Sequence, residues 1–339
     1  MAAQTSEEEQ RRKRRQRLIQ GLAMGGAAIG LPALFNALVS RRARRIPPAR
    51  WGSNDRYPWH GVDVVYQSLG QGRPLVLLHS FGPGHAGDEW RRAAELLAEN
   101  ARVFVPDLLG WGQSGTAMAR SGRAYDGELY IELISQFLKD VVREPAVLAA
   151  AGLPAAYAVQ IAVDQPETVL GLGLVVPHGM EDHSDEPDIK DAVVHRLLRL
   201  PILGTSALNL YTSHSAMTNY LRHEVYASPA LVDDALVEEH FRRAHQPGAQ
   251  GALAAYLSGY LNHGVRELLG RLDVPVWIAW GRRALTPSIE SADLWLHHLP
   301  GAGLEVLEQC GVLPHAESPE ELCRKLELFL GKLNDQNPQ

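Results

Sequence analysis

Histidine and acidic side chains that could transfer protons follow several short apolar runs of the chain. His79 ends the run that begins at Pro74, and Asp107 follows the run that begins at Val103. Near the C-terminus, the segment Gly311-Val-Leu-Pro-His-Ala-Glu317 places a histidine and a carboxylate close together. Such side chains do acid–base or nucleophilic chemistry only when a fold brings them to one place. The turns after the apolar runs are therefore where a site is expected.

One turn that could present a nucleophile lacks it. The segment Val147-Leu-Ala-Ala-Ala-Gly-Leu-Pro-Ala-Ala-Tyr157 is typical of a buried strand that passes through a tight turn into a helix. A turn of this kind exposes the side chain at its apex. Gly152 occupies the apex, so no hydroxyl, thiol or carboxylate is available there, although its neighbours Ala150 and Pro154 are compact enough for a tight turn.

The elements that would position these residues alternate between strand and helix. Helical spacing, as in 89–100 and 129–142, separates short apolar or β-branched runs at 62–66, 74–79, 103–106, 146–151, 172–176, 274–280 and 304–307. This alternation predicts an α/β protein with a mostly parallel central sheet flanked by helices on both faces. A chain of 339 residues with 45% hydrophobic content can bury a large core.

One block interrupts this alternation. Residues 180–271 contain no convincing strand, and helical spacing recurs at 188–200, 215–226, 231–245 and 252–261. A helical insertion between parallel strands would cover the carboxyl edge of the sheet, where ligands bind in such folds. We therefore expect a core over 61–179 and 272–335, a helical cap over 180–271 and a linker over 46–60. Clustered cap leucines, among them Leu197, Leu203 and Leu208, are consistent with an apolar chamber, and core packing explains them equally well.

In this order and spacing, the segments resemble the α/β-hydrolase superfamily of the capped esterase, epoxide hydrolase and C–C hydrolase type, over about residues 61–331. His79-Ser-Phe-Gly-Pro-Gly84 corresponds to the H-G-x-G loop of that family, and Asp107-Leu-Leu-Gly-Trp-Gly-Gln-Ser114 to its D-x-x-G-x-G-x-S turn. The resemblance implies an α/β-hydrolase fold with the cap inserted after the sixth strand. It also implies that His79 stabilises loops and that the backbone N–H groups of Phe81 and Leu153 form an oxyanion pocket.

The same resemblance shows what is missing. The chemistry of the family needs a nucleophile, a histidine that takes its proton and an acid that orients the histidine. The matching positions of this chain carry Gly152, Val312 and Ala284, respectively. The resemblance therefore implies a degenerate member, which only its fold would name a hydrolase, that lacks triad-based hydrolysis and binds a small apolar carbonyl or ester-like ligand or a protein partner.

The alternative is an active hydrolase of an ester, amide or C–C bond with relocated catalytic residues. His315 and His178 are the candidate bases, and Asp182 is a candidate acid. Each also has a simpler interpretation, because His315 fits the start of a helix and the other two fit a solvated cap loop. The sequence shows no set of metal ligands, no dinucleotide fingerprint and no phosphate loop, so we expect no metal or cofactor.

The N-terminus carries a candidate membrane anchor. Residues 18–39 are uncharged and lie between basic clusters at 11–17 and 41–45, and a helix of that length can cross a bilayer. Two alternatives remain, a twin-arginine export signal and a basic helix that lies on an anionic membrane surface. Arginines on both flanks leave the orientation open. Glycines at 21, 25, 26 and 30 have the spacing that lets membrane helices pair, so a homodimer is possible.

Net charge limits the kinds of binding partner that we expect, and cysteine content limits the disulfide bonds. The formal net charge is −6 although the first 45 residues are basic, so the body has no general attraction for nucleic acid. Only two cysteines occur, Cys310 and Cys323, which predicts no disulfide framework. We therefore expect a membrane-associated protein with a basic N-terminal segment, residues 1–45, and an acidic α/β body.

Overall fold

The computed structural model describes residues 29–46, 51–114, 123–181 and 183–336. Its centre is an eight-stranded sheet with the order β1-β2-β4-β3-β5-β6-β7-β8. The strands are β1 (Asp55–Trp59), β2 (Val62–Leu69), β3 (Pro74–Leu78), β4 (Arg102–Pro106), β5 (Ala146–Ala151), β6 (Val169–Val175), β7 (Val276–Gly281) and β8 (Gly303–Leu307). Pairings that involve β2 are antiparallel and the others are parallel, so the predicted mostly parallel α/β-hydrolase sheet is confirmed.

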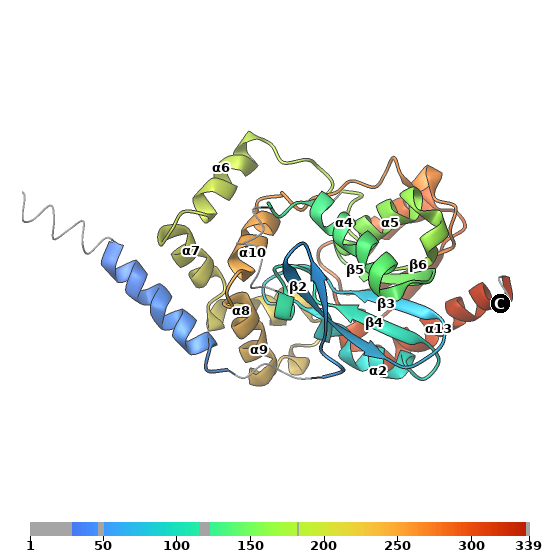
Figure 1. Ribbon diagram of the computed structural model, residues 1–339, viewed down its shortest axis with the longest axis horizontal. Coiled ribbons are helices and arrows are strands. Elements are labelled where there is room, and N and C mark those ends of the chain that lie inside the picture. The colour runs from blue at the N-terminus through green and yellow to red at the C-terminus, as the bar shows by residue number, and fades with distance from the viewer. Residues whose placement is uncertain (1–28, 47–50, 115–122, 182, 337–339) are drawn as a thin grey trace, which may run out of the picture.

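Helices cover both faces of this sheet (Figure 1). One face carries α4 (Gly127–Phe137) and α5 (Pro154–Asp164), and the other carries α2 (Arg91–Leu97) and α13 (Pro319–Gln336). The shorter helices α11 (Ala292–His298) and α12 (Pro314–Glu317) belong to the same half of the chain as β7 and β8. Every residue of β3 and β5 is buried, as expected for central parallel strands with helices on both sides.

The first strand lies inside the predicted linker. β1 pairs with β2 through a two-residue turn at His60 and Gly61, both of which have positive φ. Such a turn matches the twist of an antiparallel hairpin. The strand was not predicted because Pro58 suggested a linker. A proline is nevertheless tolerated in an edge strand, and β1 lies at the edge of the sheet. The linker therefore ends before Asp55.

The described residues between β6 and β7, where an insertion was expected, form a cap with five α-helices. They are α6 (Ile189–Leu198), α7 (Leu203–Tyr211), α8 (His214–Tyr220), α9 (Asp234–Ala244) and α10 (Ala249–Leu257). α7 was not predicted as a separate helix. The cap leucines do not line a common chamber in the described residues, because Leu208 packs against Leu253 whereas Leu197 and Leu203 are exposed to solvent.

A further helix, residues 29–43, packs against the cap (Figure 1). Its Asn36 amide donates to the Ile202 carbonyl at 3.0 Å and accepts from Ser206 and Asn209 at 3.0 and 2.9 Å. Within the described ranges, we find no helix with the length and apolarity needed to span a bilayer. Residues 18–28 of the predicted anchor, with three of its four glycines, lie outside those ranges, so a single-pass anchor is not confirmed.

We predict that Asn36→Ala detaches this helix from the cap. The substitution leaves the hydrogen-bonding groups of Ser206 and Asn209 without their partner, which costs about 1–3 kcal/mol. Amide hydrogen exchange of residues 29–43 should therefore accelerate, while exchange in α5 is unchanged. Leu38→Ala is the matched control, since Leu38 is exposed. Equal protection in Asn36→Ala and wild type would show that these hydrogen bonds do not hold the helix.

Candidate functional site

The turn between β5 and α5 keeps the shape of a nucleophile elbow. Gly152 has a φ of +64°, a conformation that side chains rarely adopt. Its N–H donates to the Val175 carbonyl at 3.0 Å, and its carbonyl accepts from the N–H of His178 at 3.2 Å. A Cβ atom here would lie 3.2 Å from the Cβ of Ser80. The apex is thus rigidly held and has little spare room, yet it carries no reactive group.

The two other vacant positions are also integrated into the fold. Ala284 is buried in the turn after β7, where its N–H donates to the Gly281 carbonyl at 3.1 Å. Val312 donates its N–H to the Val225 carbonyl of the cap at 3.0 Å and packs against both the core and the cap. Neither side chain can take up or release a proton, so these positions supply no acid or base.

The predicted oxyanion donors lie beside the apex. Among the residues that the structure describes, no acceptor pairs with the backbone N–H of Phe81 or of Leu153. The Phe81 ring is buried, stacks on Trp111 with 4.8 Å between centroids and lies 4.8 Å from the Tyr130 ring. Both N–H groups could donate to a carbonyl oxygen, but large aromatic side chains enclose the loop that carries one of them.

His79 and Asp107 hold the loops around the apex. Nδ1 of His79 donates to the Ser80 carbonyl at 2.7 Å, and its Nε2 accepts from the Leu108 N–H at 3.0 Å. Burial lowers the pKa of His79 to about 4, so the ring is neutral near pH 7. The Asp107 carboxylate accepts from the N–H groups of Gly87 and Gln113. The loop-stabilising role expected of His79 fits these contacts.

A buried carboxylate lies at the centre of the site. Glu89, in the short helix η1 (Gly87–Trp90), accepts hydrogen bonds from the Ser80 N–H at 2.6 Å and from the Ser80 hydroxyl at 3.2 Å. It also accepts from Nδ1 of His85 and from Nε2 of His315, each at 3.0 Å. Its side chain is 6% exposed, so these four contacts replace water almost completely. We call Ser80, His85, Glu89 and His315 the Glu89 cluster.

The cluster keeps Glu89 ionised. Burial opposes the charge, but the hydrogen bonds from His315 and His85 outweigh it and hold the pKa of Glu89 well below its usual value of 4.5. The carboxylate is therefore an acceptor over the whole neutral and mildly acidic range. It cannot serve as a general acid, because a general acid must carry a proton near the working pH.

Ser80, His85 and Glu89 have the residue types of a catalytic triad but not its geometry. The Ser80 hydroxyl lies 2.8 Å from Nδ1 of His85, the same nitrogen that faces Glu89. Nε2 of His85 lies 3.0 Å from the Tyr220 hydroxyl of the cap. In a triad, the nucleophile and the acid engage opposite nitrogens of the ring. Here one nitrogen is shared, so the arrangement ties loops together better than it activates Ser80.

The relocated bases that the sequence suggested are both buried. The His315 ring stacks on Trp90 with 3.9 Å between centroids, and its Nδ1 has no partner among the described residues. His178 lies next to the apex, with Cδ2 3.6 Å from a Cβ atom built on Gly152. Burial, with a smaller effect of His183, lowers the pKa of His178 to about 3, which makes it a weak base. Asp182 lies outside the described residues.

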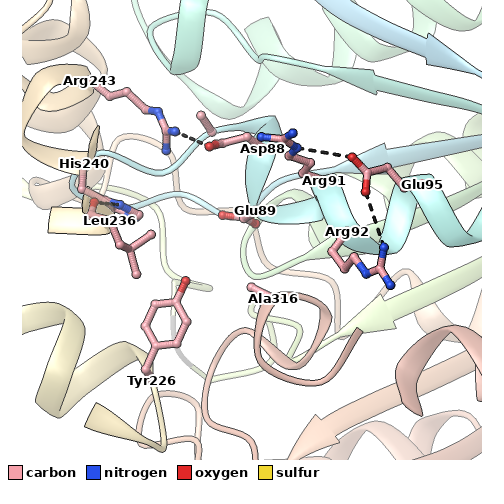
Figure 2. A pocket seen from close by; sticks show the side chains of 11 residues that line it. Asp88, Glu89, Arg91, Arg92, Glu95, Tyr226, Leu236, His240, Arg243 and Ala316 are labelled. Carbon is pink, nitrogen blue, oxygen red and sulfur yellow. Dashed lines mark hydrogen bonds and ion pairs between the residues drawn. The ribbon is translucent and has the colours of Figure 1, made fainter. Parts of the chain in front are cut away.

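A buried ion pair connects the cap to the core next to the Glu89 cluster. Arg243 of α9 is buried and pairs with Asp88 of η1, as Figure 2 shows. A cavity of about 280 Å³ opens beside this pair and is lined by Glu89, Tyr226 and His240 (Figure 2). Arg243 also donates to the Gly84 carbonyl at 3.3 Å. Residues 80–89 therefore join the elbow, the cap and the C-terminal region of the chain.

Sequence reasoning missed Ser80, His85 and Tyr220 and gave Glu89 no role. The four-residue spacing of His85 and Glu89 was a weak local signal, because residues at that spacing meet on a helix. Within the described ranges, no group of three or more histidine, cysteine or acidic side chains could hold a metal ion.

We predict that Glu89→Gln lowers the free energy of unfolding by about 3 kcal/mol near pH 7, because a buried pairing partner of two histidines is lost. A carboxyl with a lowered folded pKa stabilises the protein above its unfolded pKa of 4.5 and loses that contribution as the pH falls further. The difference between wild type and variant in urea unfolding should therefore shrink below pH 4.5. Glu95→Gln, at an exposed ion pair of α2, should change stability by less than about 1 kcal/mol. A similar small effect of Glu89→Gln would contradict the assigned role.

We also predict a pH dependence that comes from His178. A folded pKa of about 3 against a usual value of 6.5 means that only the unfolded chain binds this proton between those values. Stability should fall as the pH decreases from 6.5, with His178 contributing up to about 1.4 kcal/mol per pH unit. In urea unfolding, His178→Gln should reduce that slope, whereas the exposed control His297→Gln should not. Equal slopes in all three proteins would refute the burial of a neutral His178.

Comparison with known proteins agrees with the α/β-hydrolase fold described above. The chain matches the alpha/beta hydrolase family over residues 75–325. It is 23% identical to a 2-hydroxy-6-oxo-6-(2'-aminophenyl)hexa-2,4-dienoic acid hydrolase of Metapseudomonas resinovorans, over 81% of this chain and 90% of that protein. It is 26% identical to a pimeloyl-[acyl-carrier protein] methyl ester esterase of Vibrio vulnificus, over 80% and 99%. A solved membrane phospholipase A superposes with a TM-score of 0.67 at 22% identity, over 94% of this chain and 99% of that one. The chain belongs to the alpha/beta hydrolase family.

Proposed function

We propose that this protein is a member of its family that binds without triad-based hydrolysis. The observation that carries the proposal is Gly152, which holds the backbone conformation of a nucleophile elbow without a nucleophile. Ala284 and Val312 at the acid and histidine positions support the same conclusion. Loss of a triad leaves only the modest acceleration that binding and oxyanion contacts provide.

What the protein binds is a small apolar carbonyl or ester-like compound or a protein partner. The N–H groups of Phe81 and Leu153 support the first, because they could donate to a carbonyl oxygen. The enclosure of the site supports the second, since Ser80 and His178 are buried against the apex and the Phe81 ring is buried against Trp111. A small ligand would have to displace these side chains, so a partner that recognises the outer surface is better supported.

A second candidate is an active hydrolase with relocated residues. The relatives described above include a methyl ester esterase and a dienoic acid hydrolase by name. The specific observation in favour is the 2.8 Å contact between the Ser80 hydroxyl and His85, next to an ionised Glu89. Ser80 also lies beside the apex. Two observations oppose this candidate: Nδ1 of His85 faces both Ser80 and Glu89, and Ser80 is buried.

The deciding experiment measures hydrolysis and active-serine labelling by the full chain. We expect turnover of p-nitrophenyl acetate and butyrate no faster than in buffer, and no labelling by a fluorophosphonate probe. Saturable turnover or labelling that disappears in Ser80→Ala, but persists in the control Ser68→Ala, would overturn the proposal in favour of the second candidate. Turnover that is lost in His178→Gln or His315→Gln would also overturn the proposal and would identify that histidine as a relocated base.

A gain-of-function variant tests the same point from the other side. Gly152→Ser, Ala284→Asp and Val312→His together refill the three positions on an elbow whose φ already suits a nucleophile. A shift of a few tenths of an ångström at Ser80 would make room for the new Cβ. Turnover by this folded variant, and its loss on reverting position 152, would identify the missing side chains as the cause of inactivity.

We also propose that the protein is associated with a membrane. The uncharged segment 18–39 between two basic clusters supports this, as does the similarity to a solved membrane phospholipase over 94% of the chain. Pairing of two copies through the glycines of the N-terminal segment remains a further proposal. The side of the membrane is left open, because arginines flank both ends of the segment.

A further inference from the structure

Exposed apolar side chains gather at one end of the molecule. The described residues include fifteen exposed large hydrophobic side chains, and twelve of them lie on the helix 29–43 or within residues 189–211. The latter residues form α6, α7 and the turn between them. Figure 1 shows the three helices together on the side of the cap away from the sheet. Single exposed leucines are common, but a concentration of this kind marks an interaction surface.

The helix 29–43 exposes an apolar side in addition to the side that it packs against the cap. Its polar residue Asn36 faces the cap, where it is fully hydrogen-bonded. Leu31, Leu34 and Leu38 recur at helical spacing and are 57–68% exposed. Phe35 and Val39 are half-buried and Ala43 is buried, so the covered side is apolar too, whereas a surface helix of a soluble protein normally has a polar outer side. Its outward leucines therefore need an apolar partner.

α6 presents a second apolar stripe. None of its residues is buried. Ile189, Val193 and Leu197 follow each other at four-residue spacing and are 85%, 54% and 56% exposed. The stripe continues into the following turn with Leu200, which is 40% exposed.

α7 adds a third stripe and connects the other two. Leu203 and Leu210 are 57% and 63% exposed, on the same side of the helix. α7 contacts α6 directly, and Asn36 bonds to its first and middle turns. We call the three stripes together the cap-end face.

Basic side chains accompany the cap-end face. The helix 29–43 has no acidic residue, and Arg41, Arg44 and Arg45 at its end are exposed, whereas Arg42 pairs with Glu238 of the cap at 2.6 Å. α6 exposes Lys190 and Arg196, with Arg199 directly after it. Its first-turn acids are engaged locally, because Asp188 and Asp191 form a capping box with the helix backbone. Aliphatic stripes next to arginines are typical of helices that lie in an anionic membrane interface.

We propose that the cap-end face docks on the surface of a bilayer that contains anionic lipids, with its leucines in the interfacial region and its arginines at the headgroups. This inference rests on the membrane association proposed above and adds the region of the protein that makes contact. It does not depend on whether the elbow is catalytic.

A lipid surface fits the face better than a second protein. Protein interfaces are enriched in aromatic anchors set in pockets. Here the exposed large hydrophobic side chains are aliphatic except for Tyr211, and they lie along three separate helices. A bilayer needs no matching pocket, and its anionic headgroups complement the arginines.

The test is sedimentation of the full chain with vesicles of phosphatidylcholine alone or mixed with phosphatidylglycerol. We expect binding to the mixed vesicles that weakens as salt increases. Leu34→Glu with Leu197→Glu should reduce binding about tenfold or more, because two apolar side chains are replaced by charges that the headgroups repel. Leu285→Glu with Leu328→Glu is the matched control, since these leucines are 62% and 70% exposed outside the face.

The outcomes separate the two proposals. If wild type binds and both double variants bind equally, the cap-end face is overturned while membrane association stands. If wild type binds neither vesicle, both are overturned. If wild type instead forms a dimer in ultracentrifugation that the Leu34→Glu, Leu197→Glu variant abolishes, the face pairs two copies and the lipid inference fails. Thermal unfolding of both variants checks that the charges leave the fold intact, and Leu34→Ala with Leu197→Ala repeats the test without added charge.

Discussion

The buried carboxylate of Glu89 is the constraint on which the centre of this protein depends. An ionised group with almost no access to water must receive its hydrogen bonds from the chain, and it does so from Ser80, His85 and His315. These donors come from the loop after β3, from the approach to η1 and from α12. Because Arg243 of the cap pairs with the neighbouring Asp88, the same short helix also fixes the cap. Removing one donor would leave the buried charge with fewer hydrogen bonds in place of water, which lowers stability.

This constraint explains why conventional hydrolase features surround empty catalytic positions. His315 remains next to the vacant position of Val312 because it donates to Glu89 and stacks on Trp90, which are structural roles. His79 bridges two loops in the same way. Gly152, by contrast, contributes only backbone contacts to its surroundings. A fold can therefore keep the loops of a site whatever residue stands at its apex, and the site has to be judged from the residues that react.

The sequence was a good guide to the elements and a poor guide to the contacts. Continuous apolar runs predicted β3, β5 and β7 because strands buried on both faces have no polar residues. Pro58 concealed β1, and α7 was missed because it lies between the predicted helical segments 188–200 and 215–226. The Glu89 cluster could not be predicted, since His315 and Glu89 are 226 positions apart and only the sheet order brings α12 beside η1. The vacant positions were visible because the motifs around them are short and local.

The leucines of the cap show a different limit. Helical spacing identifies an apolar face, but it does not say whether the face points into the core or out of it. Leu208 and Leu203 belong to one helix, yet the first is buried and the second is 57% exposed. The helix 29–43 is a second example, because its polar Asn36 faces the cap while Leu31, Leu34 and Leu38 are exposed. Apolar segments near the N-terminus thus need not cross a bilayer to meet one. A capped fold whose cap carries an outward apolar face can be held at a membrane by the cap itself.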